Sequence, residues 1–185
     1  MPTTHAHYAR PIIFLHWLTL LLLIAVYATI EFRGIFPKDD PLYAAMKSWH
    51  FMLGLGVLFL SVLRLSMKAI WRHAPVIEPP IPAWQGALSS LVHVMLYVIL
   101  IGLPLAGWAI LSAAGKPIPF FGLELPPLIG VDKALSKQIK EVHETVANVG
   151  YGLIGLHTLA ALYHHYIVKD NTLPRMLPML NKRQG

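Results

Sequence analysis

The sequence predicts an all-α integral membrane protein, a bundle of four helices, and two observations support this. The chain of 185 residues is 56% hydrophobic and only 13% charged, whereas a soluble domain usually carries about 25% charged residues. Its apolar residues gather into four runs, each long enough to cross a hydrocarbon core of about 30 Å as a helix of about 20 residues. We therefore expect residues 1–185 to form a single transmembrane domain.

The first two spans lie in the N-terminal half of the chain. One covers Ile12–Ile30, where His16 is the only side chain that can carry a charge near neutral pH. The next runs from about residue 46 to Met67. The first span is longer than the apolar core of a typical signal peptide, and its bulky end at Tyr27–Ile30 offers no small-residue cleavage site. We expect it to remain as a membrane helix.

The other two spans are Ala87–Leu111 and roughly Val142–Val168. Pro104 interrupts the third span, which a membrane helix tolerates where neighbouring helices satisfy the freed carbonyl group. Residues 112–140 separate the two spans, and four prolines make this segment too irregular for another crossing helix. Its end, Lys133–Lys140, can be helical. The prolines are Pro117, Pro119, Pro126 and Pro127.

The basic residues indicate an orientation only weakly. With the N-terminus inside, eight Lys and Arg residues lie on the inner side and seven on the outer side, and the positive-inside rule counts these residues while giving acids little weight. The basic residues nearest the spans favour both termini on the inner side. These are Arg64, Lys68, Arg72 and Lys169.

The number of outer basic residues has two explanations, and the sequence leaves both open. Neighbouring acids such as Asp39 and Glu144 can neutralise them on a solvated face. Alternatively, some of them form a positive collar that attracts a small anion, since clustered charge can raise association rates about tenfold or more.

Four histidines lie inside the predicted spans, and their depths match in pairs. An ionisable side chain in the membrane is costly and therefore indicates a functional site. His16 lies near the inner end of its span and His50 near the outer end of the next. On the fourth span, His143 lies near the outer end and His157 follows fourteen residues later. Fourteen residues are almost four helical turns, so both face the same way about 21 Å apart.

These depths pair His16 with His157 near the inner face and His50 with His143 near the outer face. Neutral imidazole is a common axial ligand of haem iron, so we expect two non-covalent haem b groups, each held by two histidines. The chain has no cysteine, which excludes covalent attachment through a Cys-x-x-Cys-His motif and iron–sulfur clusters. Gly54 and Gly150 lie on the same faces as the histidines and leave room for a flat porphyrin.

The remaining histidines are assigned other positions. His93, near the inner end of the third span, is the main rival as a ligand, and we interpret it as a hydrogen-bond partner of a haem propionate or a quinone. His5 and His7 lie in the N-terminal tail and His73 at the inner interface. His164 and His165 end the fourth span, where they are interfacial or line a site near the inner haem.

Several segments together resemble the bacterial cytochrome b561 family over nearly the whole chain. They are His16-Trp17-Leu18, Glu31 to Pro37, His143 to Tyr151, Gly155-Leu156-His157, His164-His165-Tyr166 and Lys169 to Leu173. The resemblance implies a four-helix dihaem protein of the bacterial inner membrane, and it implies axial ligands at the same four histidines that the depth argument selects.

Within this family, the chain looks most similar to members that oxidise superoxide to dioxygen at the periplasmic side and reduce ubiquinone in the membrane. Superoxide is a small anion, so this function needs positive charge near the outer haem. The candidates are Arg33, Lys38, Lys133, Lys137 and Lys140. Quinone reduction needs a proton donor and polar partners for the carbonyl oxygens at the inner end. The candidates are His164, His165, Lys169, Asp170 and His93.

Two other functions are compatible with four membrane histidines. A cytochrome b subunit can oxidise quinol and deliver electrons to a redox partner, although such subunits usually need more docking surface than these short termini provide. A haem-storage or assembly protein is the non-enzymatic alternative. The apolar spans indicate membrane lipid as a partner, and the resemblance implies ubiquinone and superoxide. We expect no nucleic acid and no obligatory protein partner.

Overall fold

The computed structural model of the protein describes residues 7–71 and 74–183, except for the side chains of 181–183. His5, Arg72 and His73 lie outside the described residues. Four long helices are apolar enough to cross a membrane, which confirms the predicted fold class of a transmembrane four-helix bundle. They are α1 (Arg10–Phe32), α2 (Pro41–Ile70), α3 (Ala83–Ala113) and α4 (Lys133–Tyr163).

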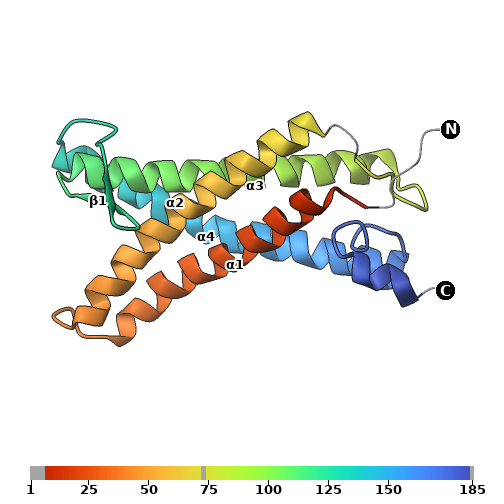
Figure 1. Ribbon diagram of the computed structural model, residues 1–185, viewed down its shortest axis with the longest axis horizontal. Helices are drawn as coiled ribbons and strands as arrows, with labels where there is room; N and C mark the ends of the chain where they lie inside the picture. Colours follow the sequence, from red (N-terminus) through yellow and green to blue (C-terminus); the bar gives the residue numbers. More distant parts are fainter. Residues whose placement is uncertain (1–6, 72–73, 184–185) are drawn as a thin grey trace.

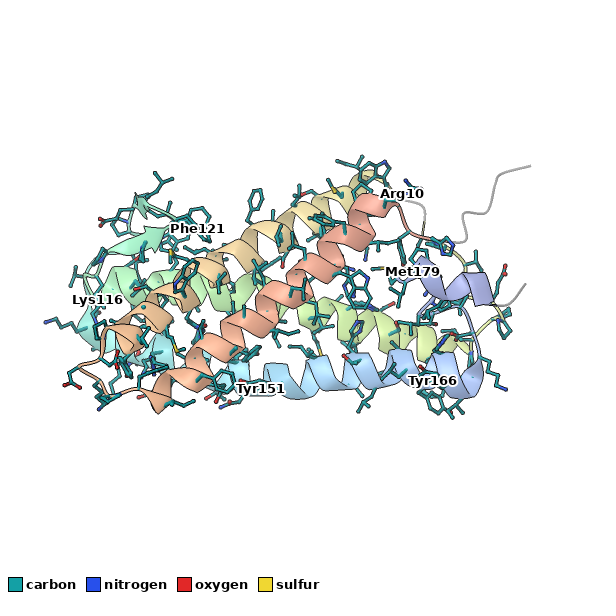
Figure 2. The ribbon with its side chains drawn as sticks, turned by 60° about the horizontal axis from the view of Figure 1, so that its bottom comes forward. Arg10, Lys116, Phe121, Tyr151, Tyr166 and Met179 are labelled. Atoms are coloured by element: carbon teal, nitrogen blue, oxygen red, sulfur yellow. The ribbon has the colours of Figure 1, made fainter. Side chains whose placement is uncertain are left out.

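The helices form two antiparallel pairs, and α2 packs against α3 to join them. α1 packs along α2, and α3 packs along α4, whereas no two Cα atoms of α1 and α4 come within 8 Å of each other. The described ends of the chain lie together at one end of the bundle, and the strand β1 (Ile118–Phe120) lies at the other (Figure 1). We call these the terminal end and the hairpin end. Figure 2 shows Arg10 and Met179 at the first and Lys116 at the second.

Local sequence signals explain where α2 and α4 begin. The Asp40 side chain accepts a hydrogen bond from the Leu42 amide at the start of α2, and Pro41 suits the first helical position because its missing N–H needs no partner there. The Asp132 carboxylate accepts from the amides of residues 134 and 135 and caps α4. α4 therefore begins nine residues before the predicted Val142, and the Lys133–Lys140 segment is part of it.

The other helices also extend beyond the predicted spans, because each begins before the apolar run that marks its membrane crossing. α2 starts at Pro41 instead of about residue 46, and α3 starts at Ala83 instead of residue 87. After Tyr163, α4 widens into a π-helical turn, η2 (His164–Val168). Lys169 ends this turn in the left-handed region with φ 61°, and its N–H donates to the His164 carbonyl.

The segment between α3 and α4 contains a β-hairpin that the sequence analysis did not predict. β1 pairs antiparallel with β2 (Leu123–Leu125), with Ile118 opposite Leu125. The connecting residues Phe121 and Gly122 both have positive φ, 46° and 87°, as a tight two-residue hairpin turn requires. Ile118 is buried in a cluster with Leu55 and Leu111, which fixes the hairpin on α2 and α3.

Candidate haem sites

The hairpin end holds one pair of histidines, His50 of α2 and His143 of α4. Their ring centroids are 6.4 Å apart and the ring planes meet at 69°. His50 Nδ1 lies 3.1 Å from the carbonyl oxygen of Val26 on α1. A histidine that donates Nδ1–H to a carbonyl keeps Nε2 unprotonated and available to a metal, which is the usual outer-shell arrangement of a metal-binding imidazole.

The terminal end holds a second pair, His16 of α1 and His157 of α4. Their ring centroids are 6.3 Å apart, with an interplanar angle of 74°. Both pairs therefore use α4, and each takes its second imidazole from a different helix of the other antiparallel pair. The structure brings together the same two pairs that the depth argument selected; the role of these residues as ligands stays a prediction.

The spacing within each pair fits one metal ion between two imidazoles. The centroid distances of 6.3 and 6.4 Å leave a gap between the two rings of each pair that one iron atom would occupy. His93 lies closer to His157, at 5.1 Å between centroids, which is too short for this arrangement. Its Nδ1 is 2.7 Å from the carbonyl of Ser89 on its own helix. The geometry thus favours His16 over His93 as the partner of His157.

A cavity of about 550 Å³ surrounds the pair at the hairpin end. Its volume lies in the range of small-molecule and cofactor sites, and its walls come from all four helices. Gly54 lines it, and a Cβ added there would meet no atom within 4 Å, so the glycine leaves open space beside His50. A Cβ at Gly107 would lie 3.7 Å from the His143 ring. The cavity is therefore formed in part by missing side chains, as a flat porphyrin requires.

Gly150 also lines this cavity, as the sequence suggested, and it has a second role as a contact of Tyr27. A Cβ at this position would lie 2.6 Å from the Tyr27 hydroxyl oxygen, and that hydroxyl donates to the Ala147 carbonyl at 2.9 Å. Gly150 therefore admits Tyr27 to the face of α4 between the two histidine pairs. The Tyr27 ring also lies 4.1 Å from the ring of Tyr151, whose hydroxyl donates to Glu31 at 2.8 Å.

The charged residues around this cavity differ in part from the predicted collar. Arg33 and Lys140 line it as predicted, whereas Lys38, Lys133 and Lys137 are not among its lining residues. Two further cations, Lys47 and Lys116, line it and were missed by the sequence analysis. Lys47 precedes His50 by three residues on α2, and this helical spacing was the available signal. Nothing local in the sequence places Lys116 there.

Carboxylates also reach this cavity, so its charge is mixed. Glu31 and Glu144 line it with the four cations, and Lys140 forms an ion pair with Glu144 at 3.2 Å. Arg33 lies over the ring of Tyr43, 4.9 Å from its centroid. Positive groups outnumber negative ones among the lining residues, and Lys47 and Lys116 form no ion pair in the part of the chain that the structure describes.

At the terminal end, a second cavity of about 270 Å³ is lined by three of the predicted quinone-site residues together with Tyr166. The three are His165, Lys169 and Asp170. His164 contacts this group through Asp170, with Nδ1 2.5 Å from Oδ2. His93 lies apart from this cavity, beside His157.

Asp170 is buried, and its carboxylate is already held by the protein. One oxygen faces His164, and the other accepts from the Thr172 amide at 2.8 Å. Burial alone raises the pKa of this carboxyl, but the hydrogen bonds from His164 and Thr172 outweigh it and hold the pKa below its ordinary value. Asp170 therefore stays ionised near neutral pH and orients His164.

Comparison with known proteins identifies the family. Residues 7–179 match the family model described as prokaryotic cytochrome b561. The chain is 44% identical over 171 residues to cytochrome b561 homolog 1 of Escherichia coli (strain K12), and the matched region covers 92% of this chain and 97% of that protein. It is 38% identical over 181 residues to a Yersinia pestis protein named "Probable superoxide oxidase CybB", covering 98% and 99%.

The chain belongs to the prokaryotic cytochrome b561 family, because the family model spans nearly all of it. Membership implies b-type haem and an electron-transfer role across the membrane. The four apolar helices fit a multi-pass protein of the bacterial inner membrane in contact with lipid.

Proposed function

We propose that this protein is a dihaem superoxide:quinone oxidoreductase, which oxidises superoxide to dioxygen at the hairpin end and reduces ubiquinone at the terminal end. The hairpin end would face the periplasm and both termini the cytoplasm. The observation that carries the proposal is the presence of two histidine pairs, His50 with His143 and His16 with His157, at opposite ends of one bundle. The relative named as a superoxide oxidase supports the choice of substrate.

The four histidines would each bind haem iron through Nε2, and bound haem supplies one-electron exchange. Val26 orients the His50 imidazole through its carbonyl. Each superoxide loses one electron and becomes dioxygen, so two superoxide ions are needed for one quinone, which takes up two electrons and two protons to form quinol. The cavity at the hairpin end needs no acid–base group for the first half of this reaction, since superoxide gives up an electron without a proton.

Lys47 and Lys116 are the residues that we expect to attract superoxide. They line the cavity of His50 and His143 and have no ion-pair partner among the described residues. Arg33 contributes in the same way, and Glu144 partly neutralises Lys140.

The terminal end supplies the groups for quinone reduction. The cavity beside η2 has a lysine and a histidine at its wall, Lys169 and His165, which can donate to a quinone carbonyl oxygen. Histidine exchanges protons near neutral pH, and His164, oriented by Asp170, can pass a proton toward this wall. His93, next to His157, is placed to act on a haem or on a quinone close to that haem.

The direct test mixes the purified oxidised protein with superoxide and then with a ubiquinone analogue. The α-band of reduced haem should appear when superoxide is mixed with the protein. It should disappear after the quinone is added, with quinol as the product. If quinol reduces the haems and superoxide does not, the chain works in the opposite direction, as a quinol-oxidising cytochrome b that serves a redox partner.

A lysine comparison tests the location of the superoxide site. Removing one charge about 8 Å from the reacting centre changes the encounter energy by about 0.4 kcal/mol at 0.01 M salt in water. Lys47→Gln with Lys116→Gln should therefore slow haem reduction by superoxide about fourfold at 0.01 M salt and about twofold at 0.15 M. The control pair Lys133→Gln and Lys137→Gln, outside the cavity lining, should slow the reaction less at 0.01 M salt, where the Debye length is about 30 Å, and leave it nearly unchanged at 0.15 M. Equal effects of both pairs would contradict the proposed entry site.

A further inference from the structure

Arg64 and Lys68 of α2 and Arg175 of the C-terminal segment lie at the terminal end of the bundle, and among the described residues no carboxylate forms an ion pair with them. We propose that Arg64, assisted by Lys68 and Arg175, binds the carboxylate groups of the haem held between His16 and His157. This inference rests on the proposed haem role of that pair and extends it to the groups that hold the edge of the haem.

The helical register points Arg64 toward this site. Arg64 follows His50 on α2 by fourteen residues, the same interval that separates His143 from His157 on α4. Fourteen residues are almost four turns, or about 21 Å along the axis. Arg64 therefore occupies the position on α2, at the terminal end, that His50 occupies at the hairpin end. Because α2 and α4 both run from the hairpin end to the terminal end and His50 lies beside His143, Arg64 lies at about the depth of His157.

The guanidinium group has no anionic partner in the protein. Arg64 Nε is buried without a hydrogen-bond partner among the described residues, and so are Arg175 Nε and the Tyr97 hydroxyl. The Arg64 guanidinium and the Lys68 ammonium lie 5.9 and 5.6 Å from the centroid of the Tyr97 ring. An aromatic face stabilises a cation only in part.

The ion pairs in the described part of the chain lie elsewhere, at Lys140–Glu144 and His164–Asp170. Arg175 of the C-terminal segment donates one hydrogen bond from Nη1 to the Pro75 carbonyl at 2.6 Å. Unpaired cations inside a membrane protein are costly and are found where they meet a negative group. The free donors of Arg64 and Arg175 thus define a place for an anion with several acceptor oxygens.

Haem b carries two carboxylates on one edge, and the planar guanidinium group matches a carboxylate with two parallel hydrogen bonds. The hairpin end is different, because its cations line an open cavity together with Glu31 and Glu144. A buried positive charge also favours the reduced form of the nearer haem, which carries one more electron.

The test compares holoprotein variants at position 64. In Arg64→Gln, haem transfer to an excess of a haem-scavenging apoglobin should become about tenfold or more faster for one of the two haems, because charge-assisted hydrogen bonds are lost. A redox titration of the α-band should show a lower midpoint potential for that same haem. Arg64→Lys should restore most of both properties. Arg10→Gln, which removes a charge from an exposed position at the same end, should change neither.

If Arg64→Gln fails to assemble with two haems, haem transfer and midpoint potential are measured on Lys68→Gln and Arg175→Gln instead. Unchanged haem transfer and potential in Arg64→Gln would overturn the proposal, as would equal changes in Arg10→Gln. A variant that keeps its haem properties but loses tightly bound anionic phospholipid would show that the site holds a lipid phosphate instead. If the unaltered protein holds only one haem, the dihaem proposal itself fails. If His16→Ala keeps both haems, the assignment of His16 as a ligand fails, and in either case Arg64 is not yet at issue.

Discussion

The contact between Gly150 and Tyr27 gives the sharpest test of how the bundle is packed between its two histidine pairs. In Gly150→Ala, the new Cβ would lie 2.6 Å from the Tyr27 hydroxyl oxygen, far inside van der Waals contact. Movement of the ring would break the hydrogen bond from its hydroxyl to the Ala147 carbonyl at 2.9 Å and disturb its contact with the Tyr151 ring at 4.1 Å.

The expected magnitude follows from two opposing terms. Overpacking a filled site costs about 1–3 kcal/mol, while alanine in place of glycine inside a helix gains about 0.5–1 kcal/mol. Gly150→Ala should therefore destabilise the protein by about 0.5–2 kcal/mol. In the Tyr27→Phe background the hydroxyl is gone, so the same change should become neutral or stabilising. The coupling between the two substitutions should then be about 1–3 kcal/mol.

The assay is thermal unfolding of the detergent-solubilised holoprotein, where about 1 kcal/mol corresponds to a shift of about 2–4 °C for a chain of this size. Gly152→Ala is the matched control on the same helix, because a Cβ there meets nothing within 4 Å; it should not lower the melting temperature. The reasoning is refuted if Gly150→Ala lowers the melting temperature equally with tyrosine and with phenylalanine at position 27.

Three further predictions concern the ligands and the helix ends. His50→Ala and His143→Ala should each remove one haem, and His16→Ala and His157→Ala should each remove the other, while His93→Ala should keep both. Pyridine haemochrome content and α-band spectra measure this. Loss of a haem in His93→Ala would contradict the pairing. The folded-state pKa of Asp170 lies below its unfolded value, so its contribution to stability should be full above about pH 4 and lost as the pH falls through the folded pKa. The melting temperatures of Asp170→Asn and of the unaltered protein should therefore differ at pH 7 and converge in acid. Asp132→Ala should lower the stability by about 1 kcal/mol through the loss of the α4 cap, as measured by thermal unfolding. Glu124→Ala, which removes a carboxylate that caps no helix in the described residues, is the control.

The predictable parts of this structure are those that depend on one helix at a time. A membrane segment must satisfy its own backbone hydrogen bonds, so an apolar run of sufficient length becomes a helix. The depth of His16 or His157 then follows from counting residues along its helix, and the side of the bundle follows from the 3.6-residue period. The two close histidine pairs could therefore be expected from the sequence.

The parts that were missed depend on contacts between elements or on signals outside the apolar runs. The start of α4 is set by the Asp132 cap, a polar signal that a search for apolar residues overlooks. The hairpin has only three residues in each strand, and its turn places Phe121 at positive φ, a position that sequence alone assigns to glycine or asparagine. Burial of Ile118 against Leu55 and Leu111 compensates for this conformation.

The cations around the cavity show the same difference between features set by one helix and features set by contacts between elements. Lys133 and Lys137 were selected because they lie in the outer part of the sequence, but cavity access depends on which way each side chain leaves its helix. Lys116 reaches the cavity because Gly115, at φ 65°, turns the chain after α3. That turn brings the lysine back toward the bundle, which no periodicity in the sequence could indicate.

The spacing of the two helix pairs ties these observations together. α1 and α4 stay apart over their lengths, although packing them directly would bury more apolar surface in contact with protein. Between them stand the imidazoles of His16 and His157 and the Tyr27 side chain that Gly150 admits. A cavity of about 550 Å³ at the hairpin end would lose dispersion contacts on all its walls if nothing filled it. The separation of α1 and α4 and the open cavity at the hairpin end are therefore consistent with a bundle that holds rigid, flat groups between its helices.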